Sequence, residues 1–258
     1  MSTTTVTGLL DGKSTLVIGA SQGIGAAAAR HFAAQGARLV IGSRNVEALE
    51  ALRDELRGQG HEVEAVGVDV TDRATIDAAV RKACDLYGRL DAAFNNAGVG
   101  AVESFHEFTE KAYDHLLDVN LKGVFLSMQA EIKAMLASGG GAIVNTSSVG
   151  GLVGNFGMAP YIAAKHGVIG LTKAAAFEYG RLNLRVNALA PGSTATEMFL
   201  GGMEHAPAEI VAKFNTFSPM NRIGQPLEIA TAAAWLLSDQ AGYVTGATMP
   251  VDGGFLLA

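Results

Sequence analysis

Residues 14–25 read STLVIGASQGIG, and this stretch carries the strongest structural signal in the chain. Its first five residues, Ser14 to Ile18, form the β-branched and apolar run that is typical of a strand buried on both faces. The run passes through a glycine-rich turn into an Ala-rich helical pattern from Ile24 to Gln35, which Gly36 is placed to end. A strand that enters a helix through glycines predicts the first unit of an alternating α/β sheet.

Short apolar runs alternate with longer helical patterns over the rest of the chain. The predicted strands are 14–18, 38–41, 62–68, 90–94, 142–146, 184–189 and 248–251, and the predicted helices are 24–35, 46–56, 72–87, 109–136, 160–179 and 227–237. Because parallel strands need long crossover connections, strands that are separated by helices pair in parallel. The sequence therefore predicts one α/β domain, residues 1–258, with a doubly wound, Rossmann-like sheet of seven parallel strands and helices on both faces.

The composition excludes several classes of protein. Hydrophobic residues make up 49% of the 258 residues and charged residues 17%, which is too apolar for a disordered chain. The single cysteine, Cys84, cannot form an intramolecular disulfide framework, and the net charge of −6 disfavours binding to nucleic acid. No apolar run reaches the roughly 18 residues of a membrane span, and residues 1–5 do not resemble a signal peptide. We therefore expect a cytoplasmic protein without a membrane segment.

The glycine-rich turn has the properties of a phosphate-binding site. Gly19 permits a tight turn out of the strand, Gly23 lets the main chain approach a pyrophosphate, and Gly25 allows the helix to pack close to the sheet. The free N–H groups at the start of the helix, together with its positive end, would face the phosphates. Glycines can also make a plain tight turn, but the position at the first strand-to-helix junction favours nucleotide binding.

A second pattern suggests acid–base chemistry. Tyr161 and Lys165 are four residues apart on a predicted helix that Pro160 is suited to begin, so their side chains share one face. A phenol has a pKa of about 10, and a nearby ammonium group lowers it toward the range that is useful at neutral pH. Such a pair is also common on helix surfaces, so it needs support from other motifs.

Five motifs in a fixed order supply that support over the whole chain. They are Gly19-x-x-x-Gly23-x-Gly25, Asn95-Asn96-Ala97-Gly98 after the fourth predicted strand, Ser148 after the fifth, Tyr161-x-x-x-Lys165, and Pro191-Gly192 after the sixth. Together they resemble the short single-domain branch of the short-chain dehydrogenase/reductase family. The family usually has threonine where Ile18 stands, and that threonine joins the first strand to the loop after the fourth.

The resemblance implies an oxidoreductase that transfers hydride at a carbonyl or alcohol carbon, with Asn120, Ser148, Tyr161 and Lys165 as its catalytic set. Ser148 precedes the tyrosine by the family's interval of thirteen residues, which selects it over Ser147. Ser148 would polarise the carbonyl oxygen, and Tyr161 would exchange a proton with it. Lys165 would hold the nicotinamide ribose and lower the pKa of Tyr161, while Asn120 would anchor a proton-relaying water. No metal is expected, since the six histidines show no close ligand spacing.

The residues after the second predicted strand favour NADP(H) over NAD(H). An NAD enzyme needs an acid there to accept hydrogen bonds from the adenosine ribose, but Ser43 is neutral and Arg44 is a planar cation suited to a 2′-phosphate. By resemblance, Asp69 would accept from the adenine amino group, although it could instead cap the helix that begins near Asp72. The predicted cofactor-binding residues are Gly19, Ser21, Gln22, Gly23, Ile24, Gly25, Ser43, Arg44, Asn45, Asp69, Val70, Asn96, Ala97, Gly98, Tyr161, Lys165, Pro191, Gly192, Thr194 and Thr196.

The segment 192–216 breaks the alternating pattern. A long insertion at the carboxyl end of a strand is where a doubly wound sheet places loops that cover a ligand, so we interpret the segment as a substrate-covering lid. A surface excursion with a short helix is the alternative. The predicted substrate contacts are Ser148, Val153, Phe156, Tyr161, Met198 and Phe199.

The sequence favours NADPH-dependent reduction of a small or medium hydrophobic ketone to a secondary alcohol, in a reversible reaction. One alternative is reduction of a 3-oxoacyl-[acyl-carrier-protein], which would need basic docking residues; Arg181 and Arg185 keep it open, although residues 137–141 contain none. A nucleotide-binding sensor or scaffold is the non-enzymatic alternative, which the complete catalytic set disfavours. The resemblance also implies a homotetramer, paired through the helix of Tyr161 and the long helix before it.

Overall fold

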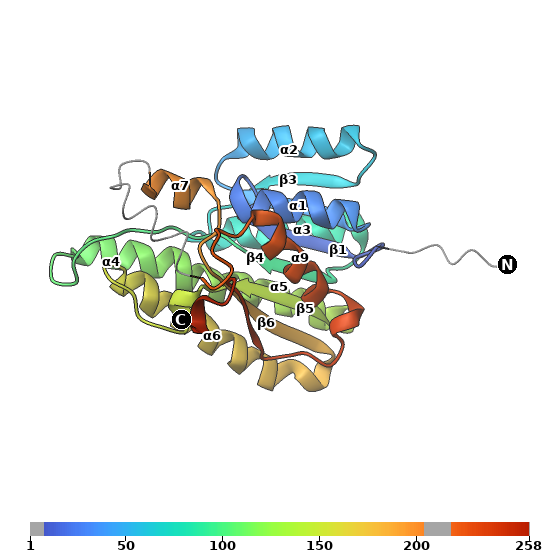
Figure 1. Cartoon of the computed structure of the whole chain (residues 1–258). Coiled ribbons are helices and arrows are strands. Elements are labelled where there is room, and N and C mark those ends of the chain that lie inside the picture. The colour runs from blue at the N-terminus through green and yellow to red at the C-terminus, as the bar shows by residue number, and fades with distance from the viewer. Residues whose placement is uncertain (1–7, 204–217, 258) are drawn as a thin grey trace.

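Seven parallel strands form one sheet in the computed structural model, which describes residues 8–203 and 218–257 (Figure 1). The strands are β1 (Ser14–Ile18), β2 (Arg38–Ser43), β3 (Val63–Gly67), β4 (Ala92–Asn95), β5 (Gly141–Thr146), β6 (Leu184–Pro191) and β7 (Thr248–Val251). The helices are α1 (Gly23–Ala34), α2 (Val46–Gly58), α3 (Arg73–Tyr87), α4 (Glu110–Leu117), α5 (Gly123–Ala137), α6 (Ala159–Tyr179), α7 (Glu197–Met203) and α9 (Pro226–Leu237). The sheet order β3-β2-β1-β4-β5-β6-β7 confirms the predicted doubly wound, single-domain fold.

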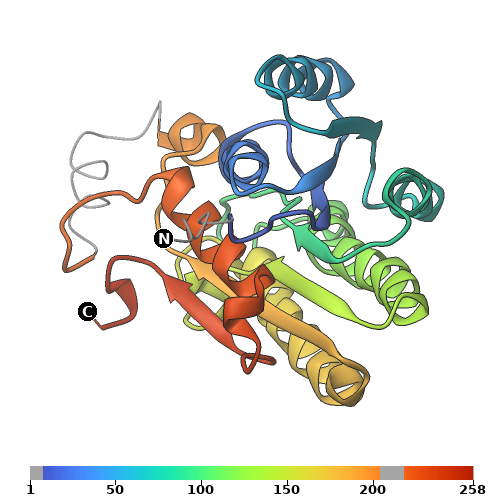
Figure 2. The same cartoon turned by 90° about the vertical axis from the view of Figure 1, so that its right-hand side faces the viewer.

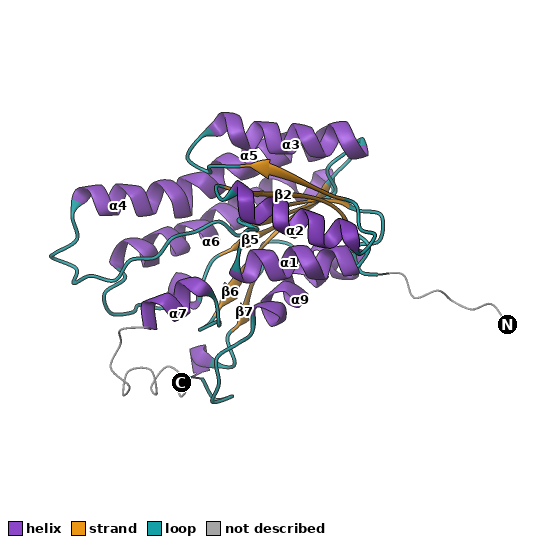
Figure 3. Cartoon of the chain, turned by 90° about the horizontal axis from the view of Figure 1, so that it is seen from above, coloured by secondary structure: helices purple, strands orange, loops and turns teal. Residues whose placement is uncertain are grey.

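Helices cover both faces of the sheet (Figures 2 and 3). α1, α2 and α9 enclose one core, in which the rings of Phe32 and Phe94 meet edge to face at 5.9 Å, and α3, α5 and α6 enclose the other. Val17 of β1 belongs to the first core, whereas Leu16 and Ile18 belong to the second. Because successive strand side chains point to opposite faces, an uninterrupted apolar run is what a strand covered on both sides requires.

Local hydrogen bonds explain several helix ends. Asn45, predicted to contact the cofactor, caps α2, because its side chain accepts a hydrogen bond from Ala48 N at 3.1 Å. Asp72, rather than Asp69, caps α3 by accepting from Ala74 N at 2.9 Å. α3 ends at Tyr87 and is capped by Gly88, whose φ of 80° lies in the left-handed region that glycine readily adopts.

The predicted helix 109–136 is not continuous. α4 passes into a π-helical turn, η1 (Asp118–Lys122), before α5 begins, and the N–H of Gly123 donates to the carbonyl of Asp118. Asn120, at the centre of this turn, is fully buried. A π turn inserts one residue into a helix that continues on both sides, so a long helical pattern in the sequence did not locate it.

β1 and β4 are neighbours in the sheet. From β1 the strand order runs to β2 and β3 at one edge, and from β4 it runs to β5, β6 and β7 at the other. Such a switch point is where open α/β sheets bind ligands, at the carboxyl ends of the strands. α4 and α7 extend beyond this edge (Figure 1). Within residues 8–203 and 218–257, no helix is long and apolar enough to cross a bilayer, and no group of three or more His, Cys, Asp or Glu could hold a metal ion.

Candidate active site

The carboxyl edge of the sheet brings together segments that lie far apart in the sequence. The glycine-rich turn follows β1, residues 96–100 follow β4, and the short 3-10 turn η2 (Val149–Gly151) follows β5. α6 packs against both η1 and η2. The predicted cofactor and catalytic residues therefore meet along one edge of the molecule.

The glycine-rich turn leaves the start of α1 open. Gly19 and Gly23 have positive φ values of 89° and 54°, and a Cβ atom on Gly25 would lie 1.9 Å from the carbonyl oxygen of Gly19. The N-cap residue, Gln22, makes no side-chain capping hydrogen bond, and the first turn of α1 contains no acidic residue. The first main-chain N–H groups and the positive end of α1 can therefore bind an anion such as a pyrophosphate. The same turn contains the other predicted contacts, Ser21 and Ile24.

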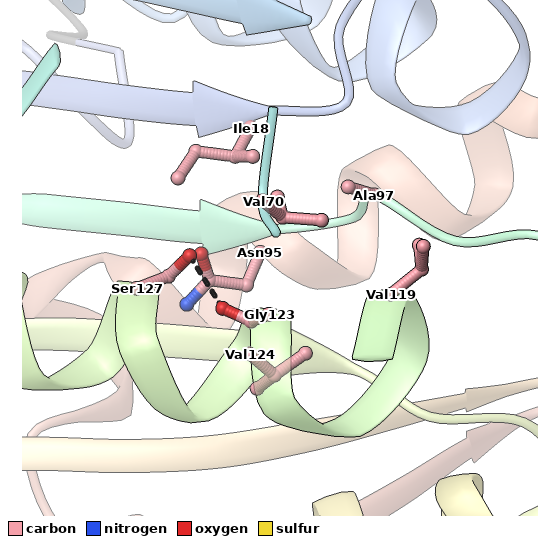
Figure 4. A pocket seen from close by; sticks show the side chains of 8 residues that line it. All are labelled: Ile18, Val70, Asn95, Ala97, Val119, Gly123, Val124 and Ser127. Carbon is pink, nitrogen blue, oxygen red and sulfur yellow. Dashed lines mark hydrogen bonds between the residues drawn. The ribbon is translucent and has the colours of Figure 1, made fainter. Parts of the chain in front are cut away.

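The loop after β4 is joined to this turn by the main chain. Asn96 N donates to the carbonyl of Ile18 at 2.9 Å, and Asn96 Nδ2 donates to the carbonyl of Gly19 at 3.3 Å. With Ile18 where the family usually has threonine, the main chain and the side chain of Asn96 both join this loop to the end of β1. The side chain of Ile18 instead lines a cavity of about 10 Å³, together with Asn95 and Ala97 (Figure 4).

Ser148, after the end of β5, and Tyr161, in the first turn of α6, are neighbours. The N–H of Gly150 donates to Ser148 Oγ at 3.1 Å, which leaves the serine hydroxyl proton available to a different acceptor. A Cβ atom on Gly150 would lie 3.5 Å from Ser148 Oγ and 3.7 Å from Tyr161 Cε1, so the two side chains are neighbours, and Ser148 acts to lower the pKa of Tyr161. This arrangement can direct a serine O–H and a tyrosine O–H toward one oxygen atom of a ligand.

Lys165 is buried beside this pair, with 3% of its surface exposed. Its Nζ lies 5.5 Å from the ring centroid of Tyr161 and donates to the carbonyl of Thr146 at 2.8 Å. Burial lowers the pKa of Lys165 to about 8, and burial raises the pKa of Tyr161, with the Ser148 hydrogen bond opposing that rise. The pKa of Tyr161 therefore shifts upward, opposite to the direction predicted from the Tyr-Lys pair, because the site is more enclosed than spacing could indicate.

Asn120 joins the π turn to the loop after β4. Its Oδ1 accepts from Val99 N at 2.9 Å and its Nδ2 donates to the carbonyl of Val99 at 2.8 Å. A Cβ atom on Gly98 would lie 2.9 Å from Asn120 Oδ1 and 3.7 Å from Lys165 Nζ, so these three residues are close neighbours. Both polar side-chain atoms of Asn120 are therefore engaged with the main chain of the loop after β4.

The ends of β2 and β3 carry the residues predicted to contact adenosine. Ser43 is buried, and Arg44, which follows it, is exposed. Asp69 accepts hydrogen bonds from Thr71 N at 2.9 Å and Thr71 Oγ1 at 2.7 Å. These bonds, with a smaller electrostatic contribution from Arg44, lower the pKa of Asp69. Val70 is buried and lines the cavity of Figure 4.

The segment after β6 reaches the glycine-rich turn. Pro191 ends β6, and Thr194, which is 5% exposed, donates to the carbonyl of Gly192 at 3.0 Å. A Cβ atom on Gly23 would lie 3.1 Å from Thr196 Cγ2. The structure therefore places this predicted cofactor segment directly against the phosphate-binding turn.

Of the predicted substrate residues, Val153, Phe156 and Met198 are exposed, while Ser148, Tyr161 and Phe199 are partly buried. Phe156 is 83% exposed, Met198 49% and Val153 38%, while Phe199 is partly buried. Met198 lies over the loop after β4, since a Cβ atom on Gly100 would be 3.7 Å from its sulfur. Of the predicted lid 192–216, the part after residue 203 lies outside the described residues.

Two apolar residues in a neighbouring loop were missed by the sequence analysis. Val102 is 73% exposed and Phe105 81%. Their loop is joined to the predicted substrate loop, because Glu103 N donates to the carbonyl of Gly157 at 2.9 Å. The sequence did contain a signal for this pair. Both residues are apolar, and they lie directly after a cofactor motif in a segment that has neither helical nor strand periodicity.

The sequence is similar to a known protein family and to known enzymes over nearly its whole length. Residues 19–256 match the family model described as "Enoyl-(Acyl carrier protein) reductase". The chain is 47% identical over 252 residues to an A-factor type gamma-butyrolactone 1'-reductase (1S-forming) of Streptomyces virginiae, covering 97% of this chain and 98% of the relative. It is 42% identical to a cyclohexanol dehydrogenase of Acinetobacter sp. (strain SE19), covering 94% of each protein.

The fold is also similar to that of solved structures. The crystal structure of a levodione reductase superimposes with a TM-score of 0.93 at 38% sequence identity, covering 96% of this chain and 99% of the other. The fold and the site define a dinucleotide-dependent oxidoreductase of the doubly wound class. The chain belongs to the short-chain dehydrogenase/reductase family, whose members use NAD(H) or NADP(H).

Proposed function

We propose that this oxidoreductase uses NADPH to reduce a ketone to a secondary alcohol, reversibly, with Ser148, Tyr161, Lys165 and Asn120 as its catalytic set. The observation that carries the proposal is the neighbouring pair of Ser148 and Tyr161 with the buried Lys165 beside it. These groups lie at the same sheet edge as the open start of α1. When bound, the nicotinamide cofactor supplies or accepts the hydride.

Each of these residues has a separate task at the substrate oxygen. The Ser148 hydroxyl donates a hydrogen bond to the carbonyl oxygen and polarises it. Tyr161 passes a proton to that oxygen in reduction and removes it in oxidation. Lys165 favours the phenolate form of Tyr161 and, next to Gly98, is placed to bind the nicotinamide ribose. Asn120 holds a proton-relaying water.

The preference for NADP(H) is testable at the end of β2. Replacing Ser43→Asp together with Arg44→Gln is expected to shift the ratio of kcat/KM for NADPH over NADH at least about tenfold toward NADH, because the new carboxylate repels a 2′-phosphate and accepts from a ribose. The measurement is steady-state kinetics with both cofactors. Arg81→Gln on α3 removes an exposed cation elsewhere and should leave the ratio unchanged. An unaltered preference in the double variant would refute the cofactor assignment.

The substrate is proposed to be a small or medium hydrophobic ketone. The exposed residues Val102, Phe105 and Phe156 are apolar. Two relatives are named for ring-containing compounds, a cyclohexanol and a gamma-butyrolactone, which supports including cyclic ketones. The test is oxidation of NADPH and NADH over a panel of cyclic and open-chain ketones, β-ketoesters, steroids and acyl thioesters. Absence of turnover with every carbonyl compound would contradict the proposal.

Reduction of a 3-oxoacyl-[acyl-carrier-protein] is less well supported. Of the two cations that could dock an acidic carrier, Arg185 donates instead to the main-chain carbonyls of Leu236, Ser238 and Val244. Arg181 is exposed. The acyl thioesters in the panel separate this reaction from simple ketone reduction.

A homotetramer is the proposed assembly, paired through α5 and α6. The apolar Phe177 of α6 is 94% exposed in the single chain, which supports an interface on this helix. Phe177→Glu is expected to lower the molar mass measured by light scattering, because it would place a charge in that interface. Leu86→Glu on α3, where the leucine is 45% exposed, is the matched control. An unchanged mass for both variants would exclude this face.

The lid function of residues 192–216 and a cytoplasmic location stay predictions.

A further inference from the structure

A buried carboxyl group lies outside the site described above. Glu131 of α5 is 0% exposed, and its Oε2 accepts a hydrogen bond from Asn95 Nδ2 of β4 at 2.9 Å. Its other oxygen, Oε1, and Asn95 Oδ1 are both buried without a hydrogen-bond partner among the described residues. The nearby Ser127 hydroxyl is engaged with the carbonyl of Gly123 at 2.9 Å (Figure 4). A buried carboxylate with an unpaired oxygen is costly and requires an explanation.

Within the part of the chain that the structure describes, the hydrogen-bonded groups next to Glu131 carry no charge. β4 presents Asn95, β5 presents its register partner Asn145, and α6 presents Thr172. α3, which packs against α5, buries only apolar side chains: Ile76, Ala79, Val80 and Ala83. The buried cation of this region, Lys165, donates to the carbonyl of Thr146 instead. Burial therefore raises the pKa of Glu131 to about 7, with the Asn95 hydrogen bond opposing the rise.

A proton on Glu131 would satisfy both unpaired oxygens. A carboxylic acid and a primary amide can form a cyclic pair, in which the amide N–H binds one carboxyl oxygen and the carboxyl O–H binds the amide oxygen. The bond from Asn95 Nδ2 to Glu131 Oε2 is the first half of such a pair. Protonated Oε1 would donate the second half to Asn95 Oδ1.

The orientation of Asn95 is passed on to α6 through a chain of hydrogen bonds. Asn95 Nδ2 donates to Asn145 Oδ1 at 3.0 Å, Asn145 Nδ2 donates to Thr172 Oγ1 at 3.0 Å, and Thr172 donates to the carbonyl of Val168 at 2.8 Å. An amide can rotate so that its oxygen and nitrogen exchange places, so the direction of this chain depends on the group at its start. That group is Glu131.

The residues that follow Asn145 at the end of β5 hold Lys165. One residue beyond Asn145, the carbonyl of Thr146 accepts from Lys165 Nζ at 2.8 Å, and Ser147 Oγ donates to the carbonyl of Lys165 at 2.8 Å. α6 is therefore joined to β5 at two levels, by Thr172 and by Lys165. A change in the hydrogen bonds of Thr172 would move α6, and α6 also carries Lys165.

We propose that Glu131 is a positioning residue, held as a neutral carboxylic acid paired with the amide of Asn95, which keeps α6 seated on β5 and thereby places Lys165 beside Tyr161. The pairing itself is independent of the reaction catalysed. The kinetic consequence rests on the function proposed above, so the experiment has one readout of each kind.

The kinetic test compares two substitutions at Glu131. Glutamine can both accept from Asn95 Nδ2 and donate to Asn95 Oδ1, so Glu131→Gln should keep kcat within about twofold of the unaltered enzyme. Glu131→Leu has similar volume but no polar group, and it should lower kcat at least about tenfold. It should also raise the apparent pKa in the pH profile of alcohol oxidation, because a misplaced Lys165 favours the Tyr161 phenolate less. Ile132→Val, on the same helix, should lower stability without moving that pKa.

The second test reports on the proton itself. Because the pKa of Glu131 is raised in the folded state, its stabilising contribution is complete below its ordinary pKa and is lost as the pH rises toward about 7. Relative to Glu131→Gln, the unfolding equilibrium constant of the unaltered protein should rise by about two powers of ten from pH 4.5 to pH 7. An infrared carboxylic-acid band at pH 6 should be present in the unaltered protein and absent from Glu131→Gln.

The outcomes separate the possibilities. If the infrared band is missing and Glu131→Gln loses activity as Glu131→Leu does, Glu131 acts as an anion and the proposal is wrong. If Glu131→Leu changes stability but leaves kcat and the pH profile intact, the residue is structural and its positioning role is refuted. If the unaltered protein reduces no carbonyl compound, the proposed function fails, while the infrared and stability data still decide the pairing, and NADPH affinity reports the placement of Lys165.

Discussion

Tyr161→Phe is expected to lower kcat about 10²- to 10⁴-fold while leaving NADPH affinity within a few-fold of the unaltered enzyme. The substitution removes one oxygen atom, the only group on this side chain that can exchange a proton with the substrate. The ring stays in place beside Lys165 Nζ, 5.5 Å from the ring centroid, so the cofactor side of the site should be preserved. The measurements are steady-state turnover with an accepted ketone and a cofactor titration.

A matched control is Tyr243→Phe. Tyr243 is fully exposed, and removal of its hydroxyl should change neither turnover nor cofactor affinity. Near-native turnover by Tyr161→Phe would remove this residue from the mechanism. Equal losses of turnover and cofactor affinity would indicate that the substitution had disturbed the site as a whole.

Gly25→Ala should weaken binding of NADPH about 10- to 100-fold and lower the free energy of unfolding by about 1–3 kcal/mol. The added Cβ would lie 1.9 Å from the carbonyl oxygen of Gly19, and it would lie 3.0 Å from Ala20 Cα. Both contacts are with the main chain, so a side-chain rotation cannot relieve them. The turn must open, and the N–H groups at the start of α1 must move away from a bound pyrophosphate.

Gly58→Ala provides the control for this substitution. Gly58 is the last residue of α2, and a Cβ atom there would meet nothing within 4 Å. Alanine has the higher helix propensity, so the free energy of unfolding should be unchanged or slightly increased. Calorimetric titration with NADPH and urea unfolding measure both variants. Native cofactor affinity in Gly25→Ala would show that this turn does not bind the phosphates.

The order and type of the elements could be predicted because each depends on neighbours in the sequence. The apolar run of β1, the glycine-rich turn and Gly36 after the first helix are local signals, and the structure confirms the fold that they predict. The four-residue interval between Tyr161 and Lys165 is local in the same sense. One helical turn places both side chains on one face whatever surrounds them.

Other features depend on contacts between distant segments. Asn120 was predicted as a site residue, but its bonds to Val99 join residues 21 positions apart and appear only when η1 meets the loop after β4. The upward shift in the pKa of Tyr161 follows from enclosure of the folded site. Arg185 carries the positive charge that docking of an acidic carrier would need. Its guanidinium instead donates hydrogen bonds to main-chain carbonyls more than fifty residues away in the sequence.

Local chemistry thus sufficed for the strand and helix order, the glycine-rich turn and the shared face of Tyr161 and Lys165, since backbone preference and periodicity act over a few residues. The π turn at Asn120, the carbonyl that receives Lys165, and the buried pairing of Glu131 with Asn95 arise from packing of β4, β5, α5 and α6 on one another. Burial and hydrogen-bond partners are properties of the assembled fold, and they set the charge states on which the chemistry depends.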